Sequence, residues 1–172
     1  MTRLGRLRRG LRRIAPQLAV GTVAVVLALQ LVPYGRDHDN PAVRREPAWD
    51  SPRTRELAVA ACFDCHSNET KWPWYSNVAP MSWLIQRDVD DGRAVLNFSE
   101  WDLEQDEADD AAETVLDREM PPRRYLPLHA AARLDAAERR ALAAGLAATI
   151  GDHEGGDEDG DEDGDEDGDE GR

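Results

Sequence analysis

Apolar residues recur at helical spacing in four stretches of the middle of the chain, and no stretch of useful length alternates as a strand would. Each stretch is bounded by proline, glycine or a capping residue, which commonly mark the ends of helices. The predicted helices cover residues 51–61, 80–92, 99–120 and 135–151. The pattern therefore predicts an all-α domain from residue 51 to residue 150.

Short local signals indicate where some of these helices begin and end. Ser99 with Asp102, and Asp135 with Glu138, have the three-residue spacing of a capping box at a helix start. Gly92 follows an amphipathic stretch and suits the left-handed position that often terminates a helix. These signals predict the beginnings of the third and fourth helices and the end of the second.

A longer apolar run lies near the N-terminus. The nineteen residues from Ile14 to Val32 carry no charge, and at about 1.5 Å per residue a helix of this length reaches close to the roughly 30 Å of a bilayer core. Six arginines in residues 1–13 precede it and favour a cytoplasmic N-terminus. We expect residues 14–33 to be a single transmembrane anchor, with everything after it outside the cytoplasmic membrane, on the periplasmic or extracellular side.

A cleaved signal peptide is the alternative interpretation of this N-terminal pattern, because it shares the basic start and the apolar middle. The residues after Val32 read Pro-Tyr-Gly and offer no Ala-x-Ala-like cleavage site. An uncleaved anchor is therefore favoured, and both interpretations export the domain that follows.

Charge is distributed unevenly along the 172 residues. The net charge is −14, yet residues 151–172 alone hold thirteen acids and one arginine. The central part is only moderately acidic and lacks the basic footprint of a nucleic-acid-binding protein. Residues 34–50 are polar and proline-containing, which predicts an extended spacer between anchor and domain.

The C-terminal segment, residues 151–172, repeats Asp-Glu-Asp-Gly and has no apolar residue to bury. Such a composition predicts a disordered acidic tail. Glu166 occupies the position at which a calcium loop of the EF-hand type, counted from Asp161, requires glycine, so no specific calcium site is predicted. Electrostatic attraction of a basic redox partner is compatible with this charge.

Both cysteines of the chain lie in one short motif, Cys62-Phe63-Asp64-Cys65-His66. Cys-x-x-Cys-His is the pattern of c-type haem attachment, in which two thiols on one helical turn form thioethers with the haem and the adjacent histidine ligates the iron. A zinc site is disfavoured because no second pair of ligands with suitable spacing follows. A thiol-disulfide redox site remains as an alternative. The motif predicts one covalent haem c, with Cys62 and Cys65 as attachment residues and His66 as the proximal ligand.

The opposite face of the iron decides the functional class, because a second side chain there indicates electron transfer and an open position indicates binding or catalysis. Met120 is the expected distal ligand, since Pro121 and Pro122 end the helix and predict an extended turn that can present the thioether sulfur. A core methionine before a helix end is the plainer interpretation. His129 is the alternative distal ligand.

Several strings of residues together resemble the small haem-binding domain family of exported bacterial proteins, which is similar in outline to single-haem cytochromes c. The resemblance covers about residues 51–150 and implies haem c binding, usually behind one N-terminal hydrophobic segment. It does not imply a particular reaction or partner. The strings that carry it are Cys62 to Asn68, Trp72-Pro73-Trp74-Tyr75-Ser76, Gly92-Arg93, Leu96-Asn97-Phe98-Ser99-Glu100-Trp101, and Met120-Pro121-Pro122 with Tyr125 and His129.

These observations predict a membrane-anchored, single-haem cytochrome that transfers electrons to or from an unidentified redox protein, with no catalytic residue of its own. Two other functions stay open from the sequence. One is a haem-based sensor or peroxidase-like enzyme with an open sixth position. The other is a haem-free thiol-disulfide protein.

Overall fold

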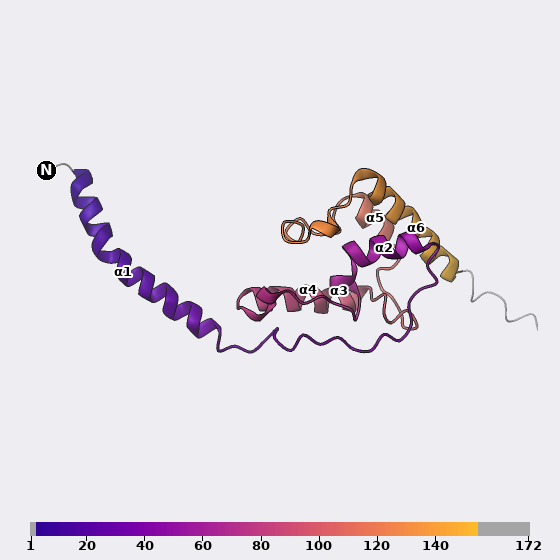
Figure 1. Cartoon of the computed structure of the whole chain (residues 1–172), viewed down its shortest axis with the longest axis horizontal. Coiled ribbons are helices and arrows are strands. Elements are labelled where there is room, and N and C mark those ends of the chain that lie inside the picture. The colour runs from indigo at the N-terminus through magenta and orange to yellow at the C-terminus, as the bar shows by residue number, and fades with distance from the viewer. Residues whose placement is uncertain (1–2, 155–172) are drawn as a thin grey trace, which may run out of the picture. The chain divides into compact units, whose positions relative to one another are not determined.

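Helices and the loops between them make up residues 3–154, the part of the chain that the computed structural model describes (Figure 1). Within that range there is no strand, only an isolated parallel bridge between Arg45 and Glu100. The predicted all-α class is therefore confirmed. The elements are α1 (Arg3–Leu29), α2 (Pro52–Ala61), α3 (Phe63–His66), η1 (Trp74–Asn77), α4 (Met81–Val95), α5 (Ala111–Leu116), η2 (Ala130–Ala132) and α6 (Ala136–Glu154), where η denotes a 3₁₀ helix.

The chain forms two compact units. The first unit comprises Met1–Glu46 and Cys62–Asp106, and the second comprises Pro47–Ala61 and Glu107–Arg172. The predicted haem domain, residues 51–150, is thus divided between them. The Cys-x-x-Cys-His motif opens the second part of the first unit, directly after α2 of the second unit ends.

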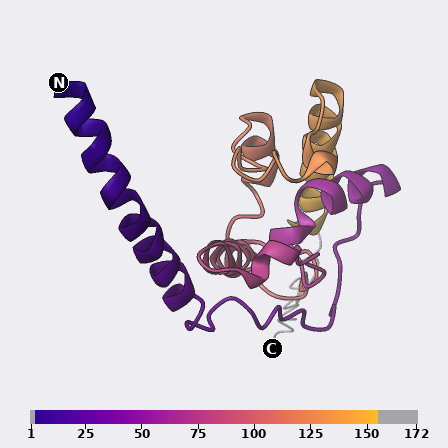
Figure 2. The same ribbon diagram turned by 60° about the vertical axis from the view of Figure 1, so that its left-hand side comes forward.

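Residues 14–29 of the N-terminal apolar run lie in α1, which contains Pro16 and is one continuous helix (Figure 2). Its side chains from Ile14 onward are mostly exposed. The uncharged run extends to Val32, whereas the helix ends at Leu29. Among the described residues, no helix combines the length and the apolar character needed to cross a membrane.

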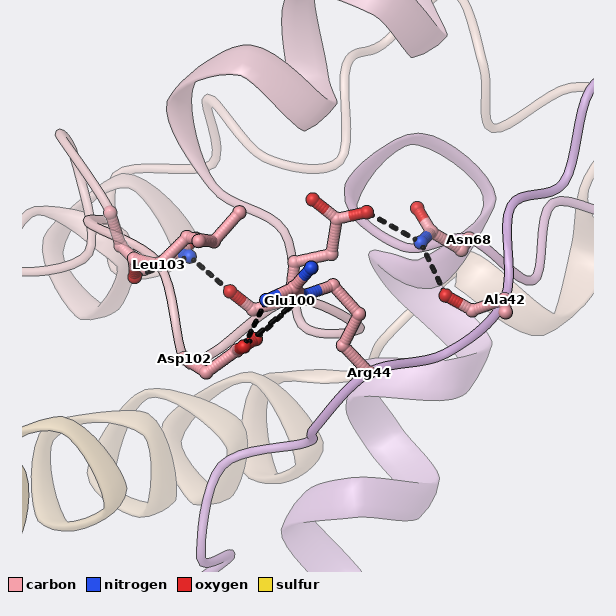
Figure 3. Close-up of polar contacts among 7 residues, drawn as sticks. Ala42, Arg44, Asn68, Glu100, Asp102 and Leu103 are labelled. Carbon is pink, nitrogen blue, oxygen red and sulfur yellow. Dashed lines mark hydrogen bonds and ion pairs between the residues drawn. The ribbon is translucent and has the colours of Figure 1, made fainter.

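Residues 34–46, here called the strap, contain no helix and pair with other segments of the first unit. The backbone N–H groups of Arg44 and Arg45 donate to the carbonyl oxygen of Ser99, at 2.8 and 3.2 Å, and Trp101 N–H donates to Arg45 O at 3.0 Å. The Arg44 side chain forms an ion pair with Asp102 (Figure 3). The strap is therefore part of the folded unit in addition to connecting it to α1.

The core of the first unit is built on a stack of three aromatic rings. Phe63 stacks on Phe98 with a centroid distance of 5.6 Å, and Phe98 stacks on Trp101 at 5.9 Å. All three side chains are buried. Offset aromatic stacking and apolar burial both stabilise this arrangement. The stack holds α3, which carries the motif, against the segment that follows α4.

The second unit is a small helical cluster in which α6 contacts α2 and α5. Leu142 and Leu146 of α6 are almost completely buried. The predicted capping box at the start of α6 is confirmed, because Asp135 Oδ1 accepts from Glu138 N–H at 2.8 Å and Glu138 Oε2 accepts from Asp135 N–H at 3.1 Å. Glycine at position 145 allows close contact with α2, since a Cβ there would lie 2.8 Å from Thr54 Cβ.

The predicted third helix, residues 99–120, is mostly wrong. Turns and irregular loop occupy residues 101–110, and only α5 is helical. The expected capping residues are used for tertiary contacts: Ser99 Oγ accepts from Asn68 N–H at 2.9 Å, and Asp102 binds Arg44. These contacts take the two side chains that a local capping box would have needed.

Two predicted helix ends are also wrong. α4 continues through Gly92 to Val95, and α6 continues through Gly151 to Glu154. Neither glycine has a positive φ, so neither terminates its helix in a left-handed conformation. From residue 155 onward, the predicted disordered tail lies outside the described residues.

Candidate functional site

The three residues of the motif that are predicted to hold haem lie on a single helical turn. Cys62 O accepts from Cys65 N–H at 3.1 Å and from His66 N–H at 2.9 Å. Cys65 and His66 belong to α3, and Cys62 is the residue before it. The two cysteines are thiols and form no disulfide with each other. The structure thus brings both thiols and the imidazole together on one element.

The orientation of the His66 ring is set by backbone carbonyl groups. Its Nδ1 lies 3.0 Å from Gly92 O and 3.1 Å from Leu96 O, both at the C-terminal end of α4. A carbonyl oxygen only accepts hydrogen bonds, so Nδ1 carries the proton and donates to both. The other ring nitrogen, Nε2, is then the one with the lone pair that suits a metal, and such support is common for ligating histidines.

Gly92 lets α4 approach this turn closely. A Cβ built at position 92 would lie 2.6 Å from the carbonyl oxygen of Cys65, a distance that a real Cβ atom essentially never shows. The obstructing atom belongs to the backbone and cannot rotate away. A residue with a side chain at position 92 would therefore separate α4 from α3 and lengthen the hydrogen bonds to His66.

A buried hydrogen-bond network, involving Asn68, Asn97, Ser99 and Glu100, fixes the chain that follows His66. Asn68 N–H donates to Ser99 Oγ at 2.9 Å. Asn68 Nδ2 donates to Glu100 Oε1, also at 2.9 Å (Figure 3). Asn97 Nδ2 donates to Asn68 Oδ1 at 3.0 Å. Buried polar groups that are all bonded hold one arrangement of the backbone. The conspicuous Asn-Phe-Ser-Glu-Trp string thus supports the turn that carries the motif.

Arg93 joins the same segment to the strap. Its Nε donates to Ser67 O at 2.8 Å, and its NH2 donates to Thr70 Oγ1 and Asn40 Oδ1, both at 3.0 Å. Burial lowers the pKa of the Arg93 guanidinium, and the nearby carboxylates, Asp39 first, oppose that shift. Arg93 stays charged because its ordinary pKa is far above neutrality.

Burial raises the pKa of the Cys62 thiol to about 12, and the nearby Cys65 adds to the effect. Reactive thiols in disulfide exchange have lowered pKa values, since the thiolate is the nucleophile. Cys62 therefore lacks the lowered pKa that is typical of a nucleophilic cysteine in a thiol-disulfide site.

Met120 and His129, the two distal-ligand candidates, belong to the second unit, whereas the motif belongs to the first. The backbone of Met120 is held on both sides: its N–H donates to Thr114 O at 3.1 Å, and its carbonyl accepts from Arg139 NH1 at 3.3 Å. The residue is 36% exposed, more than is usual for a methionine in a packed core. The exposure therefore disfavours the plainer interpretation of Met120 as a core residue.

His129 has the same kind of backbone support as His66. Its Nδ1 lies 2.9 Å from Tyr125 O, and its ring stacks on the Tyr125 ring at a centroid distance of 3.6 Å. Nδ1 is therefore the donor, and Nε2 is the nitrogen suited to a metal. Local geometry keeps both Met120 and His129 as candidates.

The described residues hold no cluster of three or more histidine, cysteine, aspartate or glutamate side chains that could bind a metal ion. A haem iron needs only axial ligands from the protein, because the porphyrin supplies the other four, so the motif fits a haem. The fold and this turn define a small all-α protein with the donor set of a haem-binding site.

Comparison with protein families supports the same class. The model of the family described as haem-binding domain matches residues 24–148. The chain therefore belongs to the haem-binding domain family, which confirms the resemblance seen in the sequence. No curated protein and no solved structure matches the chain. The matched range begins within α1 and includes the whole strap, which lies outside the range of the sequence resemblance.

The sequence predicted no role for three features that support the segment after His66, namely Arg93, Asn68 and the strap. Pairing the strap with residues 99–101 requires contacts across more than fifty positions, and no local pattern signals them. The string from Asn97 to Trp101 was conspicuous in composition, but its role as support for the segment after His66 depends on the fold.

Proposed function

We propose that the protein is a membrane-anchored, single-haem c-type cytochrome that passes single electrons outside the cytoplasmic membrane. The observation that carries the proposal is the fixed imidazole of His66. Its Nδ1 is held by the carbonyl oxygens of Gly92 and Leu96. His66 directly follows Cys65, the second of the two cysteines on the same helical turn. Family membership supports haem binding, and the motif supports covalent attachment.

In this proposal Cys62 and Cys65 attach the haem. Each thiol adds across one vinyl group, forming a carbon–sulfur bond while the thiol hydrogen goes to the neighbouring vinyl carbon. The addition needs no oxidant, but both cysteines must be reduced. His66 Nε2 is the proximal ligand, and the two carbonyls at its Nδ1 keep the ring from turning.

Met120 is the proposed distal ligand, with His129 as the alternative. The support for Met120 is local, since its backbone is tied to Thr114 and Arg139 while its side chain is partly exposed. A methionine–histidine pair raises the reduction potential relative to two histidines. When bound, the haem supplies the one-electron chemistry, and the protein supplies ligands, orientation and burial.

Membrane anchoring is proposed for residues 14–33. It is supported by the uncharged run that begins at Ile14, by the arginines before it and by the exposure of its apolar side chains. Covalent haem c is attached outside the cytoplasm, so the anchor and the motif agree on the compartment.

Expression of the full chain in a bacterium competent for c-type haem attachment tests the proposal. The membrane fraction should contain a chain with one haem that survives acid–acetone extraction. The Cys62→Ala/Cys65→Ala variant should lose it. Rapid carbon monoxide binding to the native haem would instead favour the sensor or peroxidase-like alternative, because it requires an open sixth position.

A further inference from the structure

The residue that follows α1 is clamped to the loop before α4. The Gln30 side-chain amide pairs with the peptide groups of Ala79 in both directions: Nε2 donates to Ala79 O at 2.9 Å, and Oε1 accepts from Ala79 N–H at 3.0 Å. Arg36 NH2 also donates to Gln30 Oε1 at 3.0 Å. The end of the apolar segment therefore has a fixed position beside the start of α4.

The strap reinforces this junction. Gly35 has a φ of +75°, and a Cβ at this position would lie 2.3 Å from Ser82 O in the first turn of α4. Only glycine combines this backbone conformation with so close an approach. Tyr34 OH donates to Asp90 Oδ2 at 3.3 Å. The contacts at residues 30, 34 and 35 thus hold one surface of the first unit next to the proposed anchor.

Large apolar side chains are exposed at this junction. Trp74, Val78, Met81 and Leu84, here called the apolar rim, are all exposed, and Trp74 is 79% exposed. The chain leaving α1 adds Leu31, Val32 and Tyr34. Elsewhere in the described part of the first unit outside α1, only Val43 and Leu103 are exposed large apolar residues. The exposed apolar surface is therefore concentrated where the anchor meets the domain.

The exposed face of α4 changes character along its length. Met81 and Leu84 in its first turn are apolar, whereas Arg87 and Asp91, further along, are charged and form an ion pair at 3.2 Å. Leu84, Arg87 and Asp91 share one face of the helix by their spacing. This change from apolar to charged residues is expected for a helix whose first turn contacts an apolar phase while the rest lies in water.

We propose that the apolar rim rests in the outer interfacial layer of the same membrane that holds the N-terminal segment. This inference rests on the proposed anchoring. Tryptophan favours the membrane–water interface, and Trp74 is the most exposed residue of the rim. A lipid surface is favoured over a protein partner because the rim continues the apolar surface of the anchor itself.

The rim also determines which way the haem motif faces. His66 and Cys65 contact α4 at Gly92, eleven residues along the helix from Met81. At 1.5 Å per residue, this places the motif roughly 16 Å along α4 from the rim. The domain would thus hold the motif away from the lipid and towards water-soluble partners.

Spin labels at single introduced cysteines test this placement in the full holo-chain reconstituted into phosphatidylcholine vesicles. The rim variants are Trp74→Cys and Leu84→Cys, the aqueous control is Asp91→Cys, and the anchor control is Val26→Cys. Relaxation by oxygen, which concentrates in lipid, is compared with relaxation by a water-soluble nickel chelate. The ratio should be several-fold higher at positions 74 and 84 than at 91.

The outcomes distinguish failure of the proposed rim placement from failure of the proposed anchoring. A lipid-like ratio at 26 with aqueous ratios at 74 and 84 would overturn the rim and leave the anchor standing, whereas an aqueous ratio at 26 would overturn both. The native chain gives a second readout that needs no introduced cysteine. Brominated lipids should quench its tryptophan emission more strongly than that of the Trp74→Phe variant, and equal quenching would contradict the proposal.

Discussion

The Nδ1 atom of His66 lies 3.0 Å from the carbonyl oxygen of Gly92, where α4 packs closely against the haem motif. The absence of a side chain at position 92 is what allows this contact. The ring orientation of the proposed proximal ligand therefore depends on a residue that is not itself a ligand.

Gly92→Ala should lower the fraction of chain that acquires covalent haem and destabilise the first unit. The new Cβ would meet Cys65 O at 2.6 Å, and relief requires a backbone shift that costs about 1–3 kcal/mol. Thermal melting and haem content of the holo-protein measure the effect. Gly21→Ala is the matched control, because a Cβ at position 21 meets nothing within 4 Å. Equal behaviour of the two variants would show that the close approach is unimportant.

Ser99→Ala should destabilise the holo-protein, whereas Ser82→Ala should not. Both side chains are fully buried. Ser99 Oγ accepts from Asn68 N–H at 2.9 Å, so its loss strands a buried donor at a cost of about 1–3 kcal/mol. Ser82 Oγ has no hydrogen-bond partner among the described residues, and its removal costs nothing comparable. Denaturant unfolding of both variants makes the comparison, and equal losses would contradict the network.

Gly145→Ala should destabilise the second unit, and Gly151→Ala on the same helix should be neutral or stabilising. A Cβ at 145 would meet Thr54 Cβ at 2.8 Å, while one at 151 meets nothing within 4 Å. Overpacking costs about 1–3 kcal/mol, and replacing an unobstructed helical glycine with alanine gains about 1 kcal/mol at most. An unchanged or higher melting temperature for Gly145→Ala would argue against the described contact of α2 with α6.

The strap should loosen at acidic pH. Hydrogen bonds from Arg44 lower the pKa of Asp102 below its ordinary value of about 3.9. A carboxyl group with a lowered pKa in the folded state stabilises the fold at pH values above its ordinary pKa. This contribution is lost as the pH falls through the folded-state pKa. Asp102→Asn should therefore mimic low pH. Amide exchange at Arg44 and Arg45 measures it, and exchange that is unaffected by either change would exclude this role.

Met120→Ala should remove the methionine-to-iron charge-transfer band of the oxidised holo-protein if Met120 is the distal ligand. His129→Ala should then leave the band in place. A band that survives Met120→Ala would exclude Met120 as the distal ligand. A native protein without the band, and with a spectrum that changes in His129→Ala, would assign His129.

Local sequence signals predicted those features that depend on neighbouring residues. Asp135 and Glu138 form their capping box because both partners lie within one turn, and Cys62 to His66 form a helical turn as the motif requires. The short residue strings around the motif likewise resembled the haem-binding domain family, to which the chain belongs.

Features that depend on distant contacts were mispredicted or missed. Ser99 and Asp102 have the spacing of a capping box, but Asn68 and Arg44 bind them, and the expected helix is replaced by turns. Glycine often ends a helix, yet Gly92 lies within α4 and lets the carbonyl oxygen of Cys65 approach this helix closely. In each case a tertiary contact outweighed a local preference of about 1 kcal/mol.

Intact mass spectrometry of the denatured full chain, purified after expression with c-type haem attachment, tests the central claim most directly. The account predicts that one haem is covalently added to the native chain and that none is added to Cys62→Ala/Cys65→Ala. The absorption spectrum of His66→Ala should show a weakened haem signal. A native chain that carries only extractable haem, or none, would contradict it.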